Sequence, residues 1–185
     1  ELLPLSAGDY QINGRVTDGV GGPGVPGVLI YLWNWSGSDY SAAISDYDGN
    51  YNLSVNTPDT YELAAQRAGF IYYNTNLDVT STTQSLQYDI PLDRGGTSID
   101  GRVFRGFSGR GIPGITVWAY VSDSNENWWD SYDVTGLDGS FSVPTYPGAA
   151  EIWVDYGYGF FGADWMNVHV PSGGRYLEIP LGREI

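Results

Sequence analysis

An internal repeat limits the possible folds of this chain more than any other feature of its sequence. Ile12–Val16 reads INGRV and Ile99–Val103 reads IDGRV. A turn segment follows each copy at the same distance, GPGVPG at Gly22–Gly27 and GRGIPG at Gly109–Gly114. Corresponding residues are 87 positions apart in both pairs. Self-similarity at a fixed spacing indicates tandem copies of one structural unit, so we expect two copies of one small domain.

The repeat also predicts the domain boundaries. We expect an N-terminal segment at residues 1–8, a first domain at 9–93, a linker at 94–96 and a second domain at 97–185. Each domain is then large enough to bury a modest hydrophobic core.

Composition and alternation favour an all-β fold. The chain has 26 Gly and 10 Pro, and aromatic residues make up 15% of it. Apolar and polar residues alternate in segments such as 10–17 and 51–55, and Asp48-Gly49 and Asp138-Gly139 are hairpin-turn signals. Short strands separated by turn signals are typical of a β-sandwich, with about seven strands in each copy. We therefore predict two tandem sandwiches of the Ig-like or prealbumin-like kind.

The N-terminal segment contains a third copy of one short motif. Ile90-Pro91-Leu92 ends the first repeat, Ile179-Pro180-Leu181 ends the second, and Leu3-Pro4-Leu5 lies 87 residues before the first of these. Residues 1–8 therefore resemble the last strand of a preceding repeat. They are either a linker remnant of a longer array or a donor strand, in which Leu2, Leu3 and Leu5 pair with an exposed sheet edge of a neighbouring chain.

Charge and composition restrict the partners. The net charge of −14 disfavours nucleic acid and anionic membrane surfaces, since their phosphates would be repelled. No run of 18 apolar residues is present, so we expect no membrane insertion. Cys is absent, which argues against a redox or thiolate-metal role. The acidic, Cys-free composition is typical of soluble extracellular proteins of the cell surface.

The repeated motifs resemble those of a known family. The order of the motifs is similar to that of the carboxypeptidase regulatory-like domain. It consists of Gly-Arg-Val, then Gly-x-Pro-Gly-Val, then Asp-Gly followed by Tyr51 or Phe141, then a closing strand. The second copy departs from the first where Thr135-Gly136-Leu137 replaces Ser45-Asp46-Tyr47.

The resemblance implies a fold and a range of roles. The fold would be a sandwich related to transthyretin-like and collagen-adhesin B-type domains. The roles would be mostly non-catalytic: stalks of surface proteins, modules of pili and accessory domains of secreted enzymes. Some B-type relatives form Lys–Asn isopeptide bonds, which this chain cannot form because all eight of its basic residues are Arg.

Catalytic chemistry has little support in the sequence. His169 is the only histidine, and neither a Gly-x-Ser-x-Gly elbow nor a zinc-ligand spacing is present. The 22 acidic residues are scattered over turns, where chance pairs of carboxylates are expected. We expect a protein that is not an enzyme.

Two acidic loops are weak candidates for calcium, and no other cofactor is expected. Oxygen ligands at alternate positions suit a calcium loop, but both loops lack its Gly at the sixth position and its Glu at the twelfth. Ordinary turns explain the same pattern. The candidate ligands are Asp46, Asp48, Asn50, Asp123, Asn125 and Asn127.

Two tripeptides match the glycosylation signal Asn-x-Ser. They begin at Asn34 and Asn52. Alternation places Asn52 on the solvent side of its strand, as the modification requires.

Aromatic residues on the outward faces of strands are the strongest indication of function. Exposed aromatic surface usually marks an interaction site. Sugars stack on such rings, subunits pack through them, or they lie beneath loops or a neighbouring domain. The predicted outward residues are Tyr31, Trp33, Trp118, Tyr120 and Trp153, with Trp128 and Trp129 in a polar loop at 123–133.

These observations favour a non-enzymatic extracellular structural protein. We expect it to be a subunit or segment of a surface filament or stalk that self-associates head to tail. The alternatives are a carbohydrate-binding accessory pair of a secreted enzyme and an adhesin.

Overall fold

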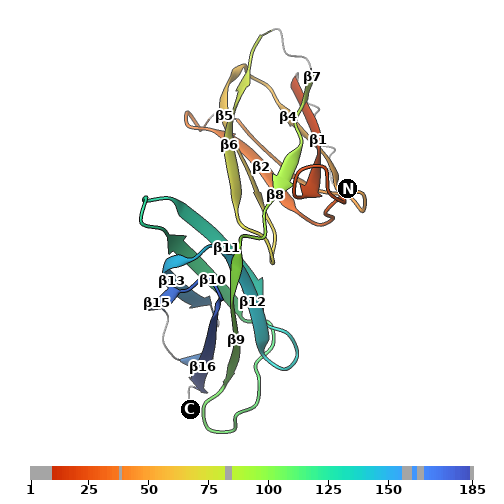
Figure 1. The fold of residues 1–185 in the computed structure, drawn as a ribbon. Helices are drawn as coiled ribbons and strands as arrows, with labels where there is room; N and C mark the ends of the chain where they lie inside the picture. The colour runs from red at the N-terminus through yellow and green to blue at the C-terminus, as the bar shows by residue number, and fades with distance from the viewer. Residues whose placement is uncertain (1–9, 38, 82–84, 156–159, 162–164, 184–185) are drawn as a thin grey trace, which may run out of the picture. The chain divides into compact units, whose positions relative to one another are not determined.

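The computed structural model describes residues 10–37, 39–81, 85–155, 160–161 and 165–183. These residues form strands and turns and no helix, which confirms the predicted all-β fold (Figure 1). The chain divides into two compact units. Repeat 1 contains residues 10–67 and 72–93, and repeat 2 contains residues 68–71 and those from 94 onward.

Repeat 1 contains two sheets. One has the order β4-β1-β7, with β8 also paired to β1, and the other has the order β3-β2-β5-β6. The strands are β1 (Tyr10–Asp18), β2 (Leu29–Asn34), β3 (Tyr40–Ile44), β4 (Asn50–Val55), β5 (Asp59–Gln66), β6 (Tyr73–Val79), β7 (Ser85–Gln87) and β8 (Ile90–Leu92).

Repeat 2 has a similar arrangement, except that its closing strand is continuous and is bordered by an additional short strand. Its sheets have the orders β12-β9-β16-β14 and β11-β10-β13-β15. The strands are β9 (Thr97–Arg105), β10 (Thr116–Ser122), β11 (Trp128–Val134), β12 (Ser140–Thr145), β13 (Gly148–Asp155), β14 (Phe160–Phe161), β15 (Trp165–Val170) and β16 (Arg175–Arg183).

The core of each repeat lies between its two sheets, because every second residue of a strand points to the same face. Ile12 and Val16 in β1 are fully buried, and so are their counterparts Ile99 and Val103 in β9. The core of repeat 2 is completed by residues from both sheets, including Val117, Ala119, Val121, Phe141, Val143, Ile152, Ile179 and Leu181.

The repeated Gly-Arg-Val motif attaches the first strand to a hairpin turn. The Arg102 Nε donates a hydrogen bond to the carbonyl oxygen of Asp138 at 2.9 Å, and Arg15 does the same to Asp48 at 2.8 Å. The turn residue Gly139 has a φ of 82°, a left-handed conformation that favours glycine. The motif is therefore explained by the fold and not by a ligand.

The first and last strands of each repeat run parallel. β1 is parallel to β7 and β8, and β9 is parallel to β16. In repeat 2, Ile99 pairs with Arg175 at the start of both strands, and Arg105 pairs with Leu181 toward their other end. The chain therefore enters the repeat at one end of this sheet and leaves at the other.

The structure differs from the sequence-based expectations in three elements. β3 was not predicted from sequence, and the closing segment 86–92 of repeat 1 is two strands, β7 and β8. The expectation that Trp128 and Trp129 lie in a loop is wrong, since both begin β11. They pair with Ser122 and Val121 of β10, so backbone hydrogen bonding to this neighbour extends the strand into the polar segment.

Residues 1–8, with Leu2, Leu3 and Leu5, lie outside the described residues. Among the residues that are described, none belongs to a helix with the length and apolar character to cross a membrane.

Candidate functional site

A row of four aromatic side chains crosses the outer face of the β11-β10-β13-β15 sheet. Trp118 of β10 lies opposite Tyr132 of β11 and Trp153 of β13, and Trp153 lies opposite Trp165 of β15. Directly opposite residues point to the same face of a sheet. Neighbouring strands are about 4.8 Å apart, so the aromatic row extends for about 14 Å across the sheet. We call these four residues the aromatic row.

The rings of the aromatic row lie at the surface. Trp165 is 53% exposed and Trp153 is 44% exposed. The rings of Trp118 and Tyr132 contact each other with centroids 4.4 Å apart and planes tilted by 31°. Trp118 also stacks on Tyr120 of the adjacent row, with centroids 6.5 Å apart and an angle of 15° between the planes. Such pairing orients the rings without removing them from solvent.

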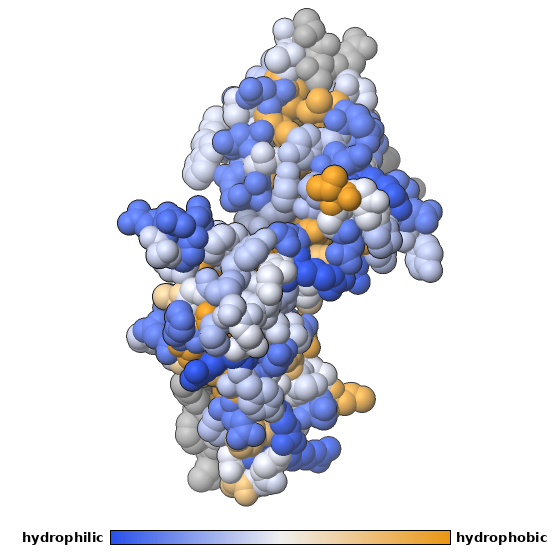
Figure 2. All heavy atoms as spheres, viewed as in Figure 1, coloured by the Kyte–Doolittle hydropathy of each residue, from blue (hydrophilic) through white to orange (hydrophobic). Residues whose placement is uncertain are grey.

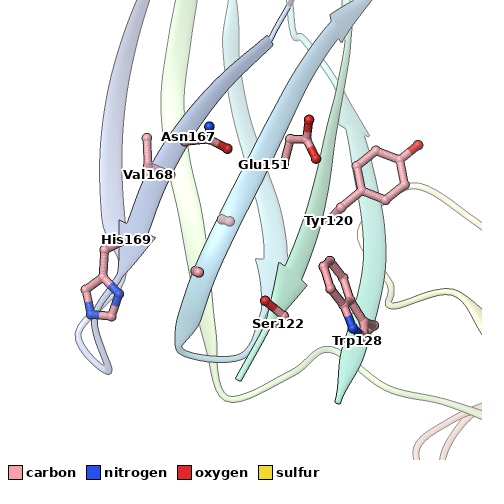
Figure 3. A pocket seen from close by; sticks show the side chains of 9 residues that line it. Tyr120, Ser122, Trp128, Glu151, Asn167, Val168 and His169 are labelled. Atoms are coloured by element: carbon pink, nitrogen blue, oxygen red, sulfur yellow. The ribbon is translucent and has the colours of Figure 1, made fainter. Parts of the chain in front are cut away.

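A row of polar residues runs beside the aromatic row on the same face. Tyr120 lies opposite Asp130 and Glu151, and Glu151 lies opposite Asn167. We call these four residues the polar row. It borders a groove of about 360 Å³ whose lining includes Tyr120, Trp128, Glu151 and Asn167. Figure 3 shows Tyr120 and Trp128 on one side of Glu151 and Asn167 on the other.

Acidic side chains predominate among the ionisable groups of the outer face. This face carries the carboxylates of Asp130, Glu151 and Asp155, and the four strands contain no arginine. Burial raises the pKa of the Asp130 carboxyl above its ordinary value. Burial also raises the pKa of the Tyr120 hydroxyl, and the charges of Asp130 and Glu151 raise it further. The face is thus suited to neutral or cationic groups.

Repeat 1 has the Glu and the Asn of the polar row but lacks the aromatic row. At the positions of the aromatic row its outer face has Ala42, Tyr31, Ala64 and Asn74. At the positions of the polar row it has Tyr40, Trp33, Glu62 and Asn76. Glu and Asn therefore occur at matching positions of both repeats, on neighbouring strands beside an aromatic residue. In repeat 1 they line a depression of about 230 Å³ together with Trp35.

The aromatic residues singled out from sequence lie in different surroundings. Tyr31 and Trp33 are half-buried and stack with centroids 5.2 Å apart. Trp118 and Tyr120 are half-buried on the outer face, and Trp128 is exposed there. Trp129 lies on the opposite face of β11, where its ring contacts the ring of Tyr146 with centroids 4.7 Å apart.

Sequence reasoning missed Tyr132 and Trp165 of the aromatic row. Alternation within Trp165–Val170 could have placed Trp165 outward, on the side opposite the buried Val170. No sequence signal gives the register that aligns it with Trp153, because that alignment depends on strand pairing.

Some of the other exposed apolar residues in the described part of the chain lie in turns. Val20 and Leu137 are each 93% exposed, and both lie in turns. Figure 2 shows hydrophobic residues as small separate patches among hydrophilic ones on one face of the molecule. Single exposed apolar side chains are ordinary on protein surfaces.

The two glycosylation candidates differ in accessibility. Asn52 is exposed on β4. Asn34 is only 2% exposed, its Nδ2 donates a hydrogen bond to Asp59 Oδ2 at 3.0 Å, and its Oδ1 accepts one from the backbone N–H of Asp39 at 3.2 Å. A glycan on the Asn34 Nδ2 would displace the hydrogen bond to Asp59. The structure therefore disfavours glycosylation of Asn34 and leaves Asn52 accessible.

The two calcium candidates use their carboxylates within their own turns. Asp46 Oδ1 accepts hydrogen bonds from the backbone N–H groups of Asp48 and Asn50 at 3.0 and 2.8 Å. Asp123 Oδ1 accepts them from Asn125 and Asn127 at 2.8 and 3.0 Å. Hydrogen bonds from the Asn50 and Asn127 side chains, together with these backbone bonds, lower the pKa of the Asp46 and Asp123 carboxyls. Turn formation accounts for both patterns, and calcium binding stays a prediction.

A catalytic arrangement has no added support from the geometry. His169 is exposed on the outer face at the rim of the groove. Within the described part of the chain, no group of three His, Asp or Glu side chains is placed to hold a metal ion.

Repeat 1 is similar to a known family. Residues 11–93 match the family model of the carboxypeptidase regulatory-like domain. The matched residues extend from β1 to just beyond β8, so the match covers one complete repeat. No curated protein matches the sequence.

Several solved structures are similar in fold at low sequence identity. The TIE protein of Bacillus anthracis has 10% identity and a TM-score of 0.41, over 95% of this chain and 34% of that one. A streptococcal ancillary pilin has 12% identity and a TM-score of 0.42, over 95% and 62%. The minor pilin of Streptococcus agalactiae has 11% identity and a TM-score of 0.40, over 95% and 97%. This chain thus spans about a third of the first of these proteins and under two thirds of the second.

Proposed function

We propose that the protein is a non-enzymatic extracellular segment of a surface stalk or filament that assembles head to tail. The observation that supports this most directly is the parallel pairing of the first and last strands in each repeat. The resemblance of the motifs to the carboxypeptidase regulatory-like domain implies the same class of role.

Parallel pairing determines how a repeat responds to tension. In repeat 2, seven consecutive residues from Ile99 to Arg105 pair with Arg175 to Leu181. Tension between the two ends of the repeat pulls β9 and β16 in opposite directions along their length. The hydrogen bonds of the ladder then share the load and must break together. A pair of strands pulled apart from one shared end would instead lose its bonds one at a time.

The antiparallel neighbour of β9 offers a contrasting geometry within the same sheet. β12 pairs with β9 so that Thr97 lies opposite Thr145 at one end of both strands. Force applied at that end separates the strands bond by bond. The two geometries use the same fold and the same β9, so a difference in strength between them reports on the direction of loading alone.

Single-molecule force spectroscopy tests the proposal. The chain contains no Cys, so introduced cysteines are unique attachment points. One protein carries Gly96→Cys and a C-terminal tag, which loads β9 against β16. The other carries Gly96→Cys with Pro147→Cys, which loads β9 against β12. Both replaced residues are exposed, so the folded repeat is preserved in each protein.

We expect the unfolding force of repeat 2 to be several-fold higher when it is pulled from its two ends than when β9 is peeled from β12. Equal forces in the two geometries, with equal unfolding midpoints, would contradict a load-bearing role.

A further inference from the structure

We propose that the outer face of the β11-β10-β13-β15 sheet binds a neutral polysaccharide. The sugar rings would lie on the aromatic row, and their hydroxyl groups would be hydrogen-bonded by the polar row. This binding function is separate from the structural role proposed above and does not depend on it.

The duplication within the chain shows that the fold does not require the aromatic row. Repeat 1 forms the same sheet with Ala42, Ala64 and Asn74 where repeat 2 has Tyr132, Trp153 and Trp165. The core of repeat 2 lies on the other face of these strands, where Ala119 and Ile152 are fully buried. Repeat 2 therefore carries three large rings at positions of its outer face where repeat 1 has none, and two of them, Trp153 and Trp165, are exposed.

The chemistry of the two rows matches that of a sugar chain. An aromatic ring has a negative face, which attracts the slightly positive C–H groups on the flat side of a pyranose ring. The remaining edge of the sugar carries hydroxyl groups that require donors and acceptors. Glu151 provides carboxylate acceptors, and Asn167 provides both an acceptor and two donors. The groove beside them, about 360 Å³, is within the range of volumes that hold small ligands.

The recurrence of Glu and Asn supports a common binding chemistry. Glu62 and Asn76 of repeat 1 lie at the same positions of the sheet as Glu151 and Asn167 of repeat 2. In both repeats an aromatic residue of the next strand, Trp33 or Tyr120, completes the arrangement. The two Glu residues are half-buried and the two Asn residues are exposed. Such positions have few packing restrictions, so the fold alone does not account for the repetition.

Charge disfavours anionic occupants of this face. The outer face carries Asp130, Glu151 and Asp155 and no arginine, so uronic acid and sulfated polymers are repelled. A second copy of the same face is repelled for the same reason, in a chain of net charge −14. Uncharged sugars have no such penalty, and their hydroxyl groups can donate to the carboxylates.

Isothermal titration calorimetry on the full chain tests the proposal. The probes are cellohexaose and N-acetylchitohexaose as neutral chains and a galacturonic acid hexamer as an anionic chain. The test variants are Trp153→Ala and Trp165→Ala. The control variants are Phe107→Ala and Tyr176→Ala, which remove aromatic residues that are 76% and 62% exposed and lie outside the β11-β10-β13-β15 sheet.

We expect at least one neutral hexamer to bind the wild type and the anionic hexamer to bind more weakly. Trp153→Ala and Trp165→Ala should each weaken the neutral chain at least about tenfold, which corresponds to about 1.4 kcal/mol. Both controls should retain wild-type affinity. Circular dichroism of each variant verifies that the sheet is retained.

Three outcomes would overturn the proposal. The first is that neither neutral hexamer binds at millimolar concentration. The second is that the control variants lose as much affinity as the test variants. The third is that sedimentation of the wild type shows self-association which Trp165→Ala abolishes, since the face would then be a contact between copies.

Discussion

At the scale of single residues, a close backbone contact explains the glycine of the Gly-Arg-Val motif. A side chain on Gly101 would collide with the carbonyl oxygen of Leu177 in β16 and come within 2.5 Å of the Phe141 ring. Gly14 is in the same position in repeat 1, against the carbonyl oxygen of Tyr88 and the Tyr51 ring. An aromatic residue after each Asp-Gly turn therefore packs over a glycine on the neighbouring strand.

Gly101→Ala should destabilise repeat 2 strongly. The added methyl group meets a backbone atom, so β9 and β16 must separate. Overpacking of this kind costs about 3 kcal/mol, which corresponds to a fall of more than about 10 °C in the unfolding midpoint of a domain of this size. Differential scanning calorimetry measures the change.

Gly173→Ala is the matched control. A side chain at Gly173 meets no atom within 4 Å. Its midpoint should remain within about 2 °C of the wild type, because a surface substitution without contacts changes stability little. Equal losses in the two variants would show that the close contact at Gly101 is not the cause.

At the scale of strands, the two repeats differ in how the last strand pairs with the first. In repeat 2 the ladder between β9 and β16 is continuous. In repeat 1 the corresponding ladder is divided between β7 and β8, and at the break Asp89 Oδ1 accepts a hydrogen bond from the backbone N–H of Arg15 at 2.9 Å. A side chain thus replaces one backbone contact of the ladder.

Repeat 1 should therefore unfold at a lower force than repeat 2 when the chain is pulled from its ends. Six paired residues in two short groups resist the load there, against seven in one group in repeat 2. Force spectroscopy should show two steps. Gly101→Ala identifies them, since it should lower the force of the stronger step and leave the weaker one unchanged. If Gly101→Ala instead lowers the force of the weaker step, repeat 2 is the weaker repeat and the prediction is wrong.

The sequence predicted most of the strands but not which strands pair with each other. Alternation located β1, β4, β9 and β10 because each has one buried face and one polar or half-exposed face. It missed β3 (Tyr40–Ile44), whose residues are half-buried or exposed on both faces. β15 and β16 are consecutive in the chain but belong to different sheets, which no sequence pattern indicates. The aromatic row depends on those pairings, so sequence could place individual members such as Trp118 and Trp153 outward but could not align them in a row.

At the scale of the whole chain, the Ile-Pro-Leu motif has a defined structural role. Ile90 and Leu92 of β8, and Ile179 and Leu181 of β16, are buried at 1% exposure or less, and their strands pair with the first strand of the same repeat. Both described repeats thus already contain this strand. Leu3-Pro4-Leu5 would therefore have to pair elsewhere if it is a strand.

The edge of repeat 1 beside β7 and β8 is one position where a strand could be added. Among the described residues, β14 borders β16 in repeat 2, whereas no strand borders β7 and β8 on their far side. An edge strand presents unpaired backbone groups to which an extended segment can add. Head-to-tail assembly would follow if residues 1–5 of one chain paired with this edge of the next, because such a contact does not close on itself.

Deletion of residues 1–8 should abolish fibres and leave the unfolding midpoint unchanged, because both repeats retain their own closing strands. Electron microscopy over a range of protein concentrations detects the fibres, and calorimetry verifies the fold. Ser6→Ala is the control and should assemble like the wild type. If fibres persist after the deletion, residues 1–8 do not act as a donor strand. In that case the surfaces that join the subunits lie on the sandwiches themselves.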